Sequence, residues 1–212
     1  MIGIIYAALI CWVQTDVKKL VAYSSVSHMG FAMLGLIALN PVGMQGAVYY
    51  MLSHGFATGG LFLCIGMMYE RYHTKDLREI GGLAKKMPVW SFFFIVMVLA
   101  SVALPGTNGF ISEFLCLIGT FISVPNAQSG YPGVLGPWYA VPAATAMVIG
   151  AMYLLYMTAK LCFGPVREPD GHHEHTELPV DLNTREIITI APIAVLCIVL
   201  GMVPWPILHA VE

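Results

Sequence analysis

The segment LPGTNGFISEF at 104–114 limits the possible folds of this chain more than any other feature. It inserts helix-breaking and polar residues into an apolar run, 88–124, in which Glu113 is the only acidic or basic residue. One helix needs only about 20 apolar residues to cross the hydrocarbon of a membrane, and this run is much longer. The pattern predicts a transmembrane helix over 88–124 that is interrupted within 104–110, near its middle.

This break brings a carboxylate to the middle of the membrane. Pro105-Gly106 and Asn108-Gly109 interrupt backbone hydrogen bonding, which lipid tolerates only where the freed groups face protein or water. An ionisable residue beside such a break indicates an ion pathway, so Glu113 is the first candidate site residue. The alternative is a short hairpin with Glu113 in a hydrated loop. The residues before Glu113 are too few and too uncharged to mark an exit to water, which favours the broken helix.

The composition is that of a membrane protein with several spans. Mean hydropathy is +0.77, and 58% of the residues are hydrophobic while 10% are charged. Such values are typical of polytopic membrane proteins. We therefore predict an all-α fold, a polytopic transmembrane helix bundle with one broken helix. The apolar runs give spans at 21–39, 44–69, 88–124, 138–163 and 186–208.

Both ends of the chain suggest a fragment of a longer protein. Residues 1–13 are apolar but too short to cross a bilayer, and they lack the basic start of a signal peptide. We expect them to be the remnant of a truncated transmembrane helix. We further expect 21–163 to form one unit that includes the broken helix, 164–185 to be a cytoplasmic loop and 186–208 to be the C-terminal transmembrane helix.

The loops between the predicted spans alternate strictly in basic content. Two opposite loops, LNPVGMQG and SVPNAQSGYPGVLGPW, contain no Lys or Arg. Because loops rich in Lys and Arg stay in the cytoplasm, the pattern places the basic loops inside and the C-terminus outside. The ten basic residues on the cytoplasmic side are Lys18, Lys19, Arg71, Lys75, Arg78, Lys85, Lys86, Lys160, Arg167 and Arg185.

Two predicted spans carry a histidine inside a polar stripe. His28 follows Ser24 and Ser25 by one helical turn, and His54 lies one turn from both Tyr50 and Thr58. Histidine can take and release a proton near neutral pH, and neighbouring hydroxyls can relay it. The alternative is that each histidine is neutral and bonds a neighbouring helix. Two such stripes together with an intramembrane glutamate favour a proton wire.

The sequence offers little for a metal or redox cofactor. The loop GHHEHTE at 171–177 contains imidazole and carboxylate groups that zinc or nickel could bind, but a solvated loop is the preferred interpretation because no second ligand cluster exists. The five cysteines are scattered singly through apolar spans, which argues against an iron–sulfur site or a disulfide framework. No phosphate-binding or dinucleotide motif is present. We predict that this chain carries out no redox chemistry and has no nucleic-acid partner.

Three segments resemble a known family. TDVKKLVAYSSVSHMGF at 15–31, MLSHGFATGGLFLCIGMMYERYHTKDLREIGGL at 51–83 and ALPGTNGFISEFL at 103–115 are similar to the antiporter-like proton-pumping subunits of respiratory complex I. These proteins contain two inverted repeats, each with one broken helix, and this chain resembles an incomplete second repeat. Related paralogues usually have Lys where Thr58 and Glu113 stand, so these two residues favour the subunit M family of bacterial NADH–quinone oxidoreductase.

The resemblance implies a role for four residues along a proton path. Glu113 matches the ionisable residue of the broken helix, which loads and releases the proton. His28 and His54 match polar residues along the central axis, and Lys18 matches a basic residue at the cytoplasmic entrance.

The resemblance also implies partners and a location. NADH, flavin, iron–sulfur clusters and quinone are expected on partner subunits and none on this chain. The expected partners are the other membrane subunits of complex I, the lipid bilayer and protons, in the bacterial inner membrane. A subunit of a multisubunit sodium/proton antiporter and a structural membrane fragment that conducts no protons remain as alternatives.

Overall fold

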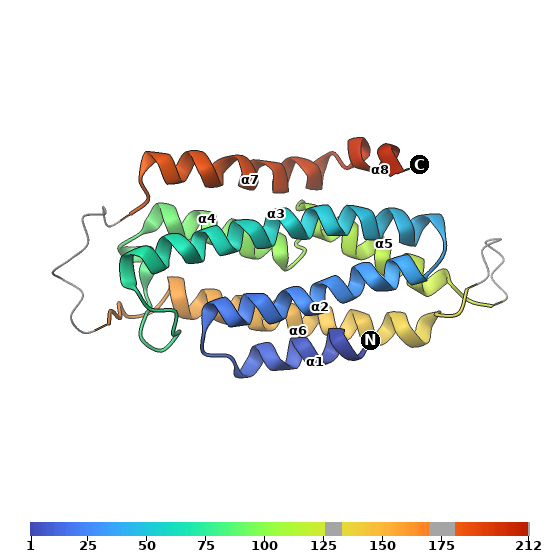
Figure 1. Ribbon diagram of the computed structural model, residues 1–212, viewed down its shortest axis with the longest axis horizontal. Helices are drawn as coiled ribbons and strands as arrows, with labels where there is room; N and C mark the ends of the chain where they lie inside the picture. The colour runs from blue at the N-terminus through green and yellow to red at the C-terminus, as the bar shows by residue number, and fades with distance from the viewer. Residues whose placement is uncertain (126–132, 170–180, 212) are drawn as a thin grey trace.

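A computed structural model describes residues 1–125, 133–169 and 181–211, and in these ranges the chain is a bundle of α-helices without strands. The helices run back and forth along one long axis (Figure 1). The predicted all-α helix bundle is therefore confirmed. The elements are α1 (Ile2–Val13), α2 (Val17–Ile37), α3 (Pro41–Tyr72), the 3₁₀ turn η1 (Leu83–Lys85), α4 (Pro88–Ser101), α5 (Asn108–Ile122), α6 (Pro137–Cys162), α7 (Thr184–Met202) and α8 (Trp205–Val211).

Four helices of the described chain, α2, α3, α6 and α7, are long and apolar enough to cross a membrane. Helices α4 and α5 contain 14 and 15 residues, so each is only about 21–23 Å long at 1.5 Å per residue. Neither alone covers a hydrocarbon core of about 30 Å. They follow one another beside α3 (Figure 1), and together they cover the thickness as two halves of a broken helix.

The break begins slightly earlier than the sequence indicated. Helix α4 ends at Ser101, whereas the interruption was predicted within 104–110. The cause is Ala103, whose φ of 60° lies in the left-handed region and turns the chain out of the helix before Pro105 is reached. Gly106, with φ 97°, then makes the turn that returns the chain to α5, a conformation that favours glycine.

The loops that contain or adjoin the basic residues lie at one end of the bundle, on the left of Figure 1. There the connection between α1 and α2 pairs with the loop after α3 through Val17 N–H to Lys75 O, at 2.9 Å. That loop pairs in turn with the segment after α6, where the backbones of Gly81 and Arg167 exchange two hydrogen bonds. These contacts organise the end of the molecule that we predict to be cytoplasmic.

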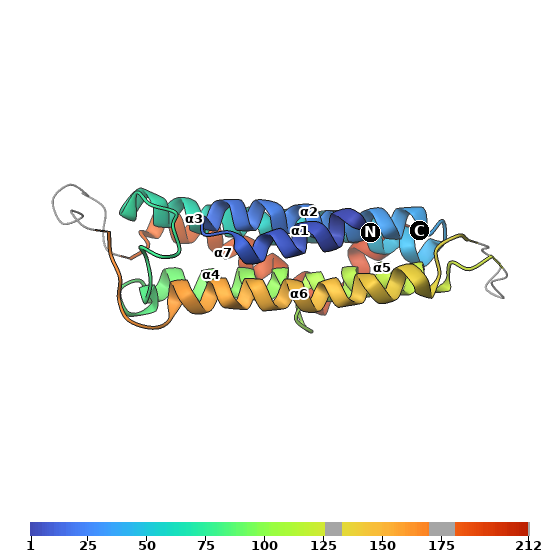
Figure 2. The same cartoon turned by 90° about the horizontal axis from the view of Figure 1, so that it is seen from below.

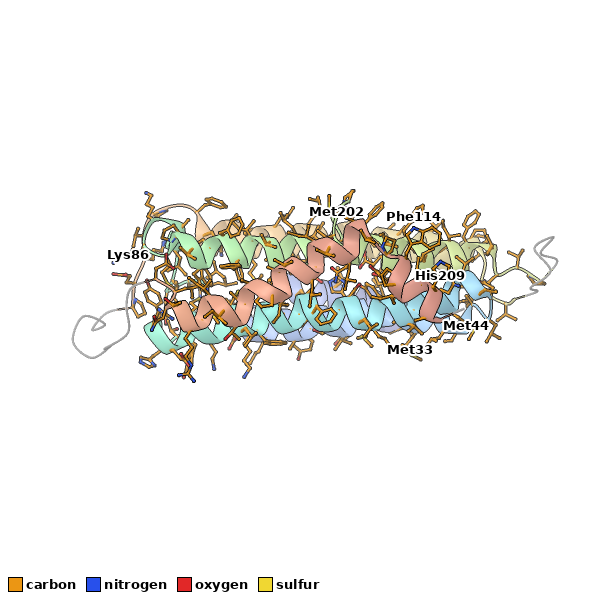
Figure 3. The ribbon with its side chains drawn as sticks, turned by 90° about the horizontal axis from the view of Figure 1, so that it is seen from above. Met33, Met44, Lys86, Phe114, Met202 and His209 are labelled. Atoms are coloured by element: carbon orange, nitrogen blue, oxygen red, sulfur yellow. The ribbon has the colours of Figure 1, made fainter. Side chains whose placement is uncertain are left out.

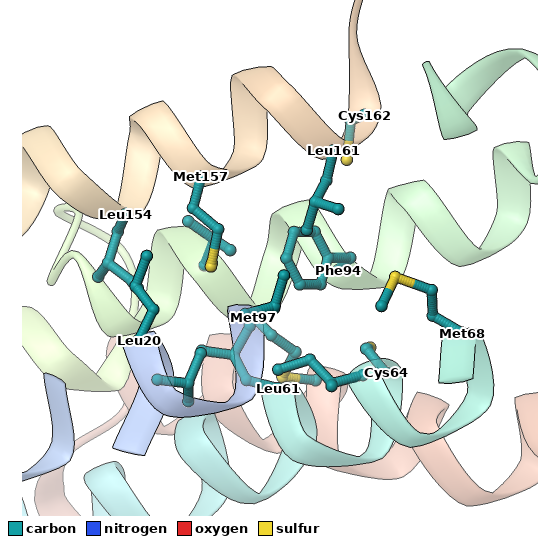
Figure 4. Packing of buried hydrophobic residues seen from close by; sticks show 14 of the residues in the cluster. Leu20, Leu61, Cys64, Met68, Phe94, Met97, Leu154, Met157, Leu161 and Cys162 are labelled. Atoms are coloured by element: carbon teal, nitrogen blue, oxygen red, sulfur yellow. The ribbon is translucent and has the colours of Figure 1, made fainter. Parts of the chain in front are cut away.

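An apolar core fills the half of the bundle nearest these loops. Trp90 stacks on Phe94 with ring centroids 4.8 Å apart, and its indole N–H donates to Cys64 O at 2.8 Å. Methionine and leucine side chains from α3, α4 and α6 complete this packing (Figure 4). Seen from below, α4, α5 and α6 form one layer, and α1, α2 and α3 lie against it (Figure 2).

Glycines allow α5 to approach α3 at backbone distance. A Cβ atom added at Gly119 would lie 2.4 Å from Gly43 Cα, and one added at Gly46 would lie 2.8 Å from Cys116 N. Small residues at helix interfaces are a common means of close packing in membranes. Because of this contact, side chains on one face of α5 point directly at α3.

Helix α7 crosses the bundle diagonally from the end of α3 towards the break (Figure 3). Near the end of α7, the hydroxyl of Tyr49 on α3 donates to Leu200 O at 2.6 Å. A Cβ at Gly201 would lie 2.3 Å from the carbonyl carbon of Thr107, so α7 rests directly on the broken segment. At its start, Arg71 bonds to Glu186 and to the carbonyl of Asp181. We call Arg71, Asp181 and Glu186 the α7 clamp.

Candidate functional site

Glu113 lies on the second turn of α5 and is 2% exposed. Its carboxylate lies inside the bundle and points towards α2 and α3. Tyr50 of α3 donates its hydroxyl proton to Glu113 Oε1 at 2.6 Å, and His28 Nδ1 of α2 lies 3.2 Å from the same oxygen. Burying a carboxylate is costly unless hydrogen bonds compensate for lost water, and these two groups supply that compensation.

His28 and Tyr50 also contact each other, with 2.8 Å between Nδ1 and the hydroxyl oxygen. His28, Tyr50 and Glu113 therefore form a closed triangle of polar groups from three helices, which we call the α2–α3–α5 triangle. The sequence predicted that His28 and Glu113 belong to one path, and the structure brings them into direct contact. The sequence did not predict Tyr50 as the partner of Glu113, although Tyr50 was part of the polar stripe around His54.

His54 lies beside this triangle. Its ring centroid is 5.7 Å from that of His28 and 6.1 Å from that of Tyr50. Its side-chain hydrogen-bond partner among the described residues is the Thr58 hydroxyl, 3.2 Å from Nδ1. The position extends the row of titratable groups along α3 by one turn, but no direct bond joins His54 to Glu113.

Lys18 is far from the triangle. It is exposed in the first turn of α2 and precedes His28 by ten positions, which corresponds to about 15 Å along the helix axis. It lies at the end of the bundle with the basic loops. Any proton that passes between Lys18 and His28 must therefore use further groups.

One such group comes from α6. The Tyr153 hydroxyl lies 2.8 Å from the Ser24 hydroxyl, and both residues are buried. Ser24 precedes His28 by one turn of α2, so this pair lies on the Lys18 side of the triangle. The sequence gave no local signal for Tyr153, because it stands in an apolar run whose rotation about the helix axis cannot be read from the residues.

A second pair fixes the start of α5. The Ser53 hydroxyl donates to Asn108 O at 3.1 Å, so the first residue of α5 is joined to α3 next to His54. Asn108 is fully buried, and its side-chain oxygen has no partner among the described residues. Sequence reasoning used Asn108 only as a helix breaker and missed this contact.

Within the described ranges, no group of three or more His, Cys, Asp or Glu side chains could hold a metal ion. The five cysteines are free thiols and buried at separate places. The predicted histidine loop 171–177 lies outside the described residues, so metal binding there stays a hypothesis. The chemistry that the described site can support is the movement of protons between nitrogen and oxygen atoms.

Comparison with known proteins identifies the family. The model of the NADH:quinone oxidoreductase/Mrp antiporter transmembrane family matches residues 1–128. The chain belongs to this family. It is 37% identical to NADH-quinone oxidoreductase subunit M of Rhodobacter capsulatus over 203 residues, which cover 96% of this chain and 36% of the relative. It is 40% identical to subunit M of Pseudomonas aeruginosa over 208 residues, or 98% of this chain and 37% of the relative.

Solved structures show the same relationship. Respiratory complex I from Thermus thermophilus with bound NADH contains a chain with TM-score 0.79 and 31% identity, matched over 99% of this chain and 41% of that one. A chain of the Mrp complex from Dietzia has TM-score 0.81 at 18% identity, over 99% of this chain and 44% of that one, which shows a common fold. The resemblance to the antiporter-like subunits is confirmed. This chain spans well under half the length of these relatives.

Proposed function

We propose that this chain is a proton-conducting membrane subunit of NADH–quinone oxidoreductase, coupled to electron transfer in other subunits. The observation that carries the proposal is Glu113, a buried carboxylate beside a helix break, bonded to both Tyr50 and His28. NADH, flavin, iron–sulfur clusters and quinone belong to partner subunits in this proposal. The partners are other membrane subunits of the complex.

The proposed proton path uses the four predicted residues in order. Lys18 lies at the entrance, on the side of the basic loops. His28 accepts a proton from that side and passes it to Glu113, while His54 holds water or a proton alongside. Glu113 then releases the proton towards the opposite side through the groups freed at the break.

The proposed orientation follows from charge. The basic loops face the cytoplasm of a bacterial cell, in its inner membrane, and the C-terminus lies outside. The proton then enters from the cytoplasm near Lys18 and leaves on the far side of Glu113. The loops at that end of the bundle (Figure 1) and the helix ends next to them contain the ten basic residues, which supports this direction.

A sodium/proton antiporter subunit is the second candidate, because the Mrp chain shares the fold. Thr58 and Glu113 stand where those proteins usually have Lys, which favours the first proposal. The two differ in a measurable way. Transport by an antiporter requires sodium and no NADH, whereas transport by the oxidoreductase requires NADH and proceeds without sodium.

The test replaces Glu113 in the membrane complex that contains this chain. Glu113→Gln preserves size and hydrogen bonding but removes the titratable proton, so NADH-driven acidification of inside-out vesicles should fall sharply at normal assembly. Glu113→Asp should retain a good part, because it keeps a carboxylate. Glu70→Gln, an exposed glutamate on α3, is the matched control and should pump normally.

Two results would contradict the proposal. Normal pumping by Glu113→Gln at wild-type assembly would remove Glu113 as the proton carrier and favour a structural role for the chain. Proton movement that depends on sodium and continues without NADH would favour the antiporter.

A further inference from the structure

The directions of the hydrogen bonds in the α2–α3–α5 triangle follow from a proton count. A tyrosine hydroxyl has one proton, and Tyr50 donates it to Glu113 Oε1 at 2.6 Å, a short bond typical of an O–H donor on a carboxylate. Its oxygen can therefore only accept from His28 Nδ1, at 2.8 Å. The Glu113 oxygen that accepts from Tyr50 lies 3.2 Å from the same nitrogen and is also an acceptor.

These two acceptors fix the tautomer of His28. A nitrogen that faces only acceptors carries the proton, so neutral His28 has its hydrogen on Nδ1 and a lone pair on Nε2. The Nε2 atom is buried and has no hydrogen-bond partner among the described residues. It is thus an open proton acceptor on the ring, while Nδ1 is the donor towards Glu113.

We infer that the Tyr50 hydroxyl is a catalytic relay that carries the proton from His28 to Glu113. This inference rests on the proposed function. A proton binds His28 Nε2 and forms an N–H bond there. The Nδ1–H bond breaks as its proton moves to the Tyr50 oxygen, and Tyr50 gives its own proton to Glu113 Oε1. Tyr50 ends neutral as it began, Glu113 ends as a neutral acid, and His28 ends neutral with its proton on Nε2. A turn of the imidazole brings the protonated nitrogen back towards Tyr50.

The distances favour this route over a direct transfer. The two relay bonds measure 2.8 and 2.6 Å, whereas the direct separation between His28 Nδ1 and Glu113 is 3.2 Å. Proton transfer needs heavy atoms within about 2.6–3.2 Å, so the direct path lies at the upper end of this range. The Phe31 ring packs edge-on against Tyr50 with centroids 6.4 Å apart, and Tyr50 is 3% exposed. The hydroxyl is therefore held in the interior, within hydrogen-bonding distance of both His28 and Glu113.

The neighbouring tyrosine provides a matched control. Tyr49 is also buried on α3 and also donates its hydroxyl, but to Leu200 O of α7 rather than to a titratable group. Tyr49→Phe and Tyr50→Phe each remove one buried hydroxyl from adjacent positions. Only the second removes an oxygen that lies between a proton donor and a proton acceptor.

The experiment measures NADH-driven proton pumping and its H₂O/D₂O rate ratio for both variants in the intact complex. We expect Tyr50→Phe to lower the pumping rate on the order of tenfold at normal assembly, less than full loss of acid–base catalysis because the direct path remains. Its solvent isotope effect should rise, since proton transfer becomes slower than other steps. Tyr49→Phe should leave the isotope effect at its wild-type value.

The outcomes separate this inference from the function on which it rests. If Glu113→Gln abolishes pumping while Tyr50→Phe pumps with a wild-type rate and isotope effect, the relay is wrong and the proposed function stands. If Glu113→Gln itself pumps normally, the proposed function fails. A loss of assembly in Tyr50→Phe is resolved by Tyr50→His, which supplies another group able to carry a proton. An assembled Tyr50→His complex should pump faster than an assembled Tyr50→Leu complex. Equal pumping rates in these two variants would contradict the relay.

Discussion

Replacing Glu186 by alanine is expected to release the start of α7 from the bundle. Arg71 is 5% exposed and Glu186 is 16% exposed at the side chain, and two bonds of 2.9 and 2.7 Å join the guanidinium to the carboxylate. The substitution removes the carboxylate partner of a buried cation, whose guanidinium also donates to the backbone carbonyls of Met67 and Asp181. It also removes the capping-box bond of Glu186 to Asn183 N–H, 2.7 Å long.

The magnitude follows from this geometry. Removing one partner of a buried ion pair costs about 3–5 kcal/mol. The carbonyl acceptors at Met67 and Asp181 and the partial exposure of Glu186 bring the expected cost to about 3 kcal/mol. Glu186→Gln retains hydrogen bonding and the capping box, so we expect a smaller cost of about 1–2 kcal/mol. The double variant Arg71→Met with Glu186→Leu removes both charges of this pair and should recover much of the lost stability.

Cys197 provides the assay, because it is fully buried on α7. A thiol-reactive fluorophore in detergent solution labels it only when α7 opens, and a cost of about 3 kcal/mol corresponds to roughly a hundredfold larger open fraction. Arg78→Ala removes the exposed pair of Arg78 with Asp76 and serves as the control, with no measurable change expected. Unchanged Cys197 labelling in Glu186→Ala, or a double variant as reactive as the single one, would refute the reasoning.

Three further results are expected. Gly119→Ala should destabilise the protein by about 1–3 kcal/mol and slow proton pumping, because its Cβ would meet Gly43. Gly55→Ala has open space around it and should cause neither effect. Equal melting temperatures for the two variants would contradict the close packing. Cysteine labelling should find 73–86 and 168–183 on the cytoplasmic side and 126–136 outside, and the opposite pattern would overturn the proposed orientation. His28→Ala should lower the pumping rate more than His54→Ala, and each should lower it less than Glu113→Gln, since water can replace one relay member. A larger loss of pumping in His54→Ala than in His28→Ala would place the path elsewhere.

The broken helix was predictable because it is a local property. Pro105 and Gly106 disfavour a continuous helix wherever they stand, and a charge inside an apolar run must find a polar partner. The start of the break was less predictable. The left-handed conformation of Ala103 depends on how the chain packs around it, and the residue type alone does not predict it.

The sequence predicted which residues form the candidate site, but it predicted less well which of them contact one another. His28, His54 and Glu113 stand out because polar residues are costly in apolar spans. Whether two of them touch depends on the rotation and separation of α2, α3 and α5, which the glycines of the interface determine. The same reason explains why Tyr153 was missed, since its hydroxyl reaches Ser24 only through the packing of α6.

The central claim is that Glu113 itself takes up and releases a proton during turnover. Infrared difference spectra of the assembled complex, recorded between its resting and NADH-reduced states, test this directly. We predict a carboxylic-acid C=O band that shifts in D₂O, moves in Glu113→Asp and is absent in Glu113→Gln. A band that persists unchanged in an assembled Glu113→Gln complex, or identical spectra for both variants and the wild type, would show that Glu113 does not change protonation and would contradict the account.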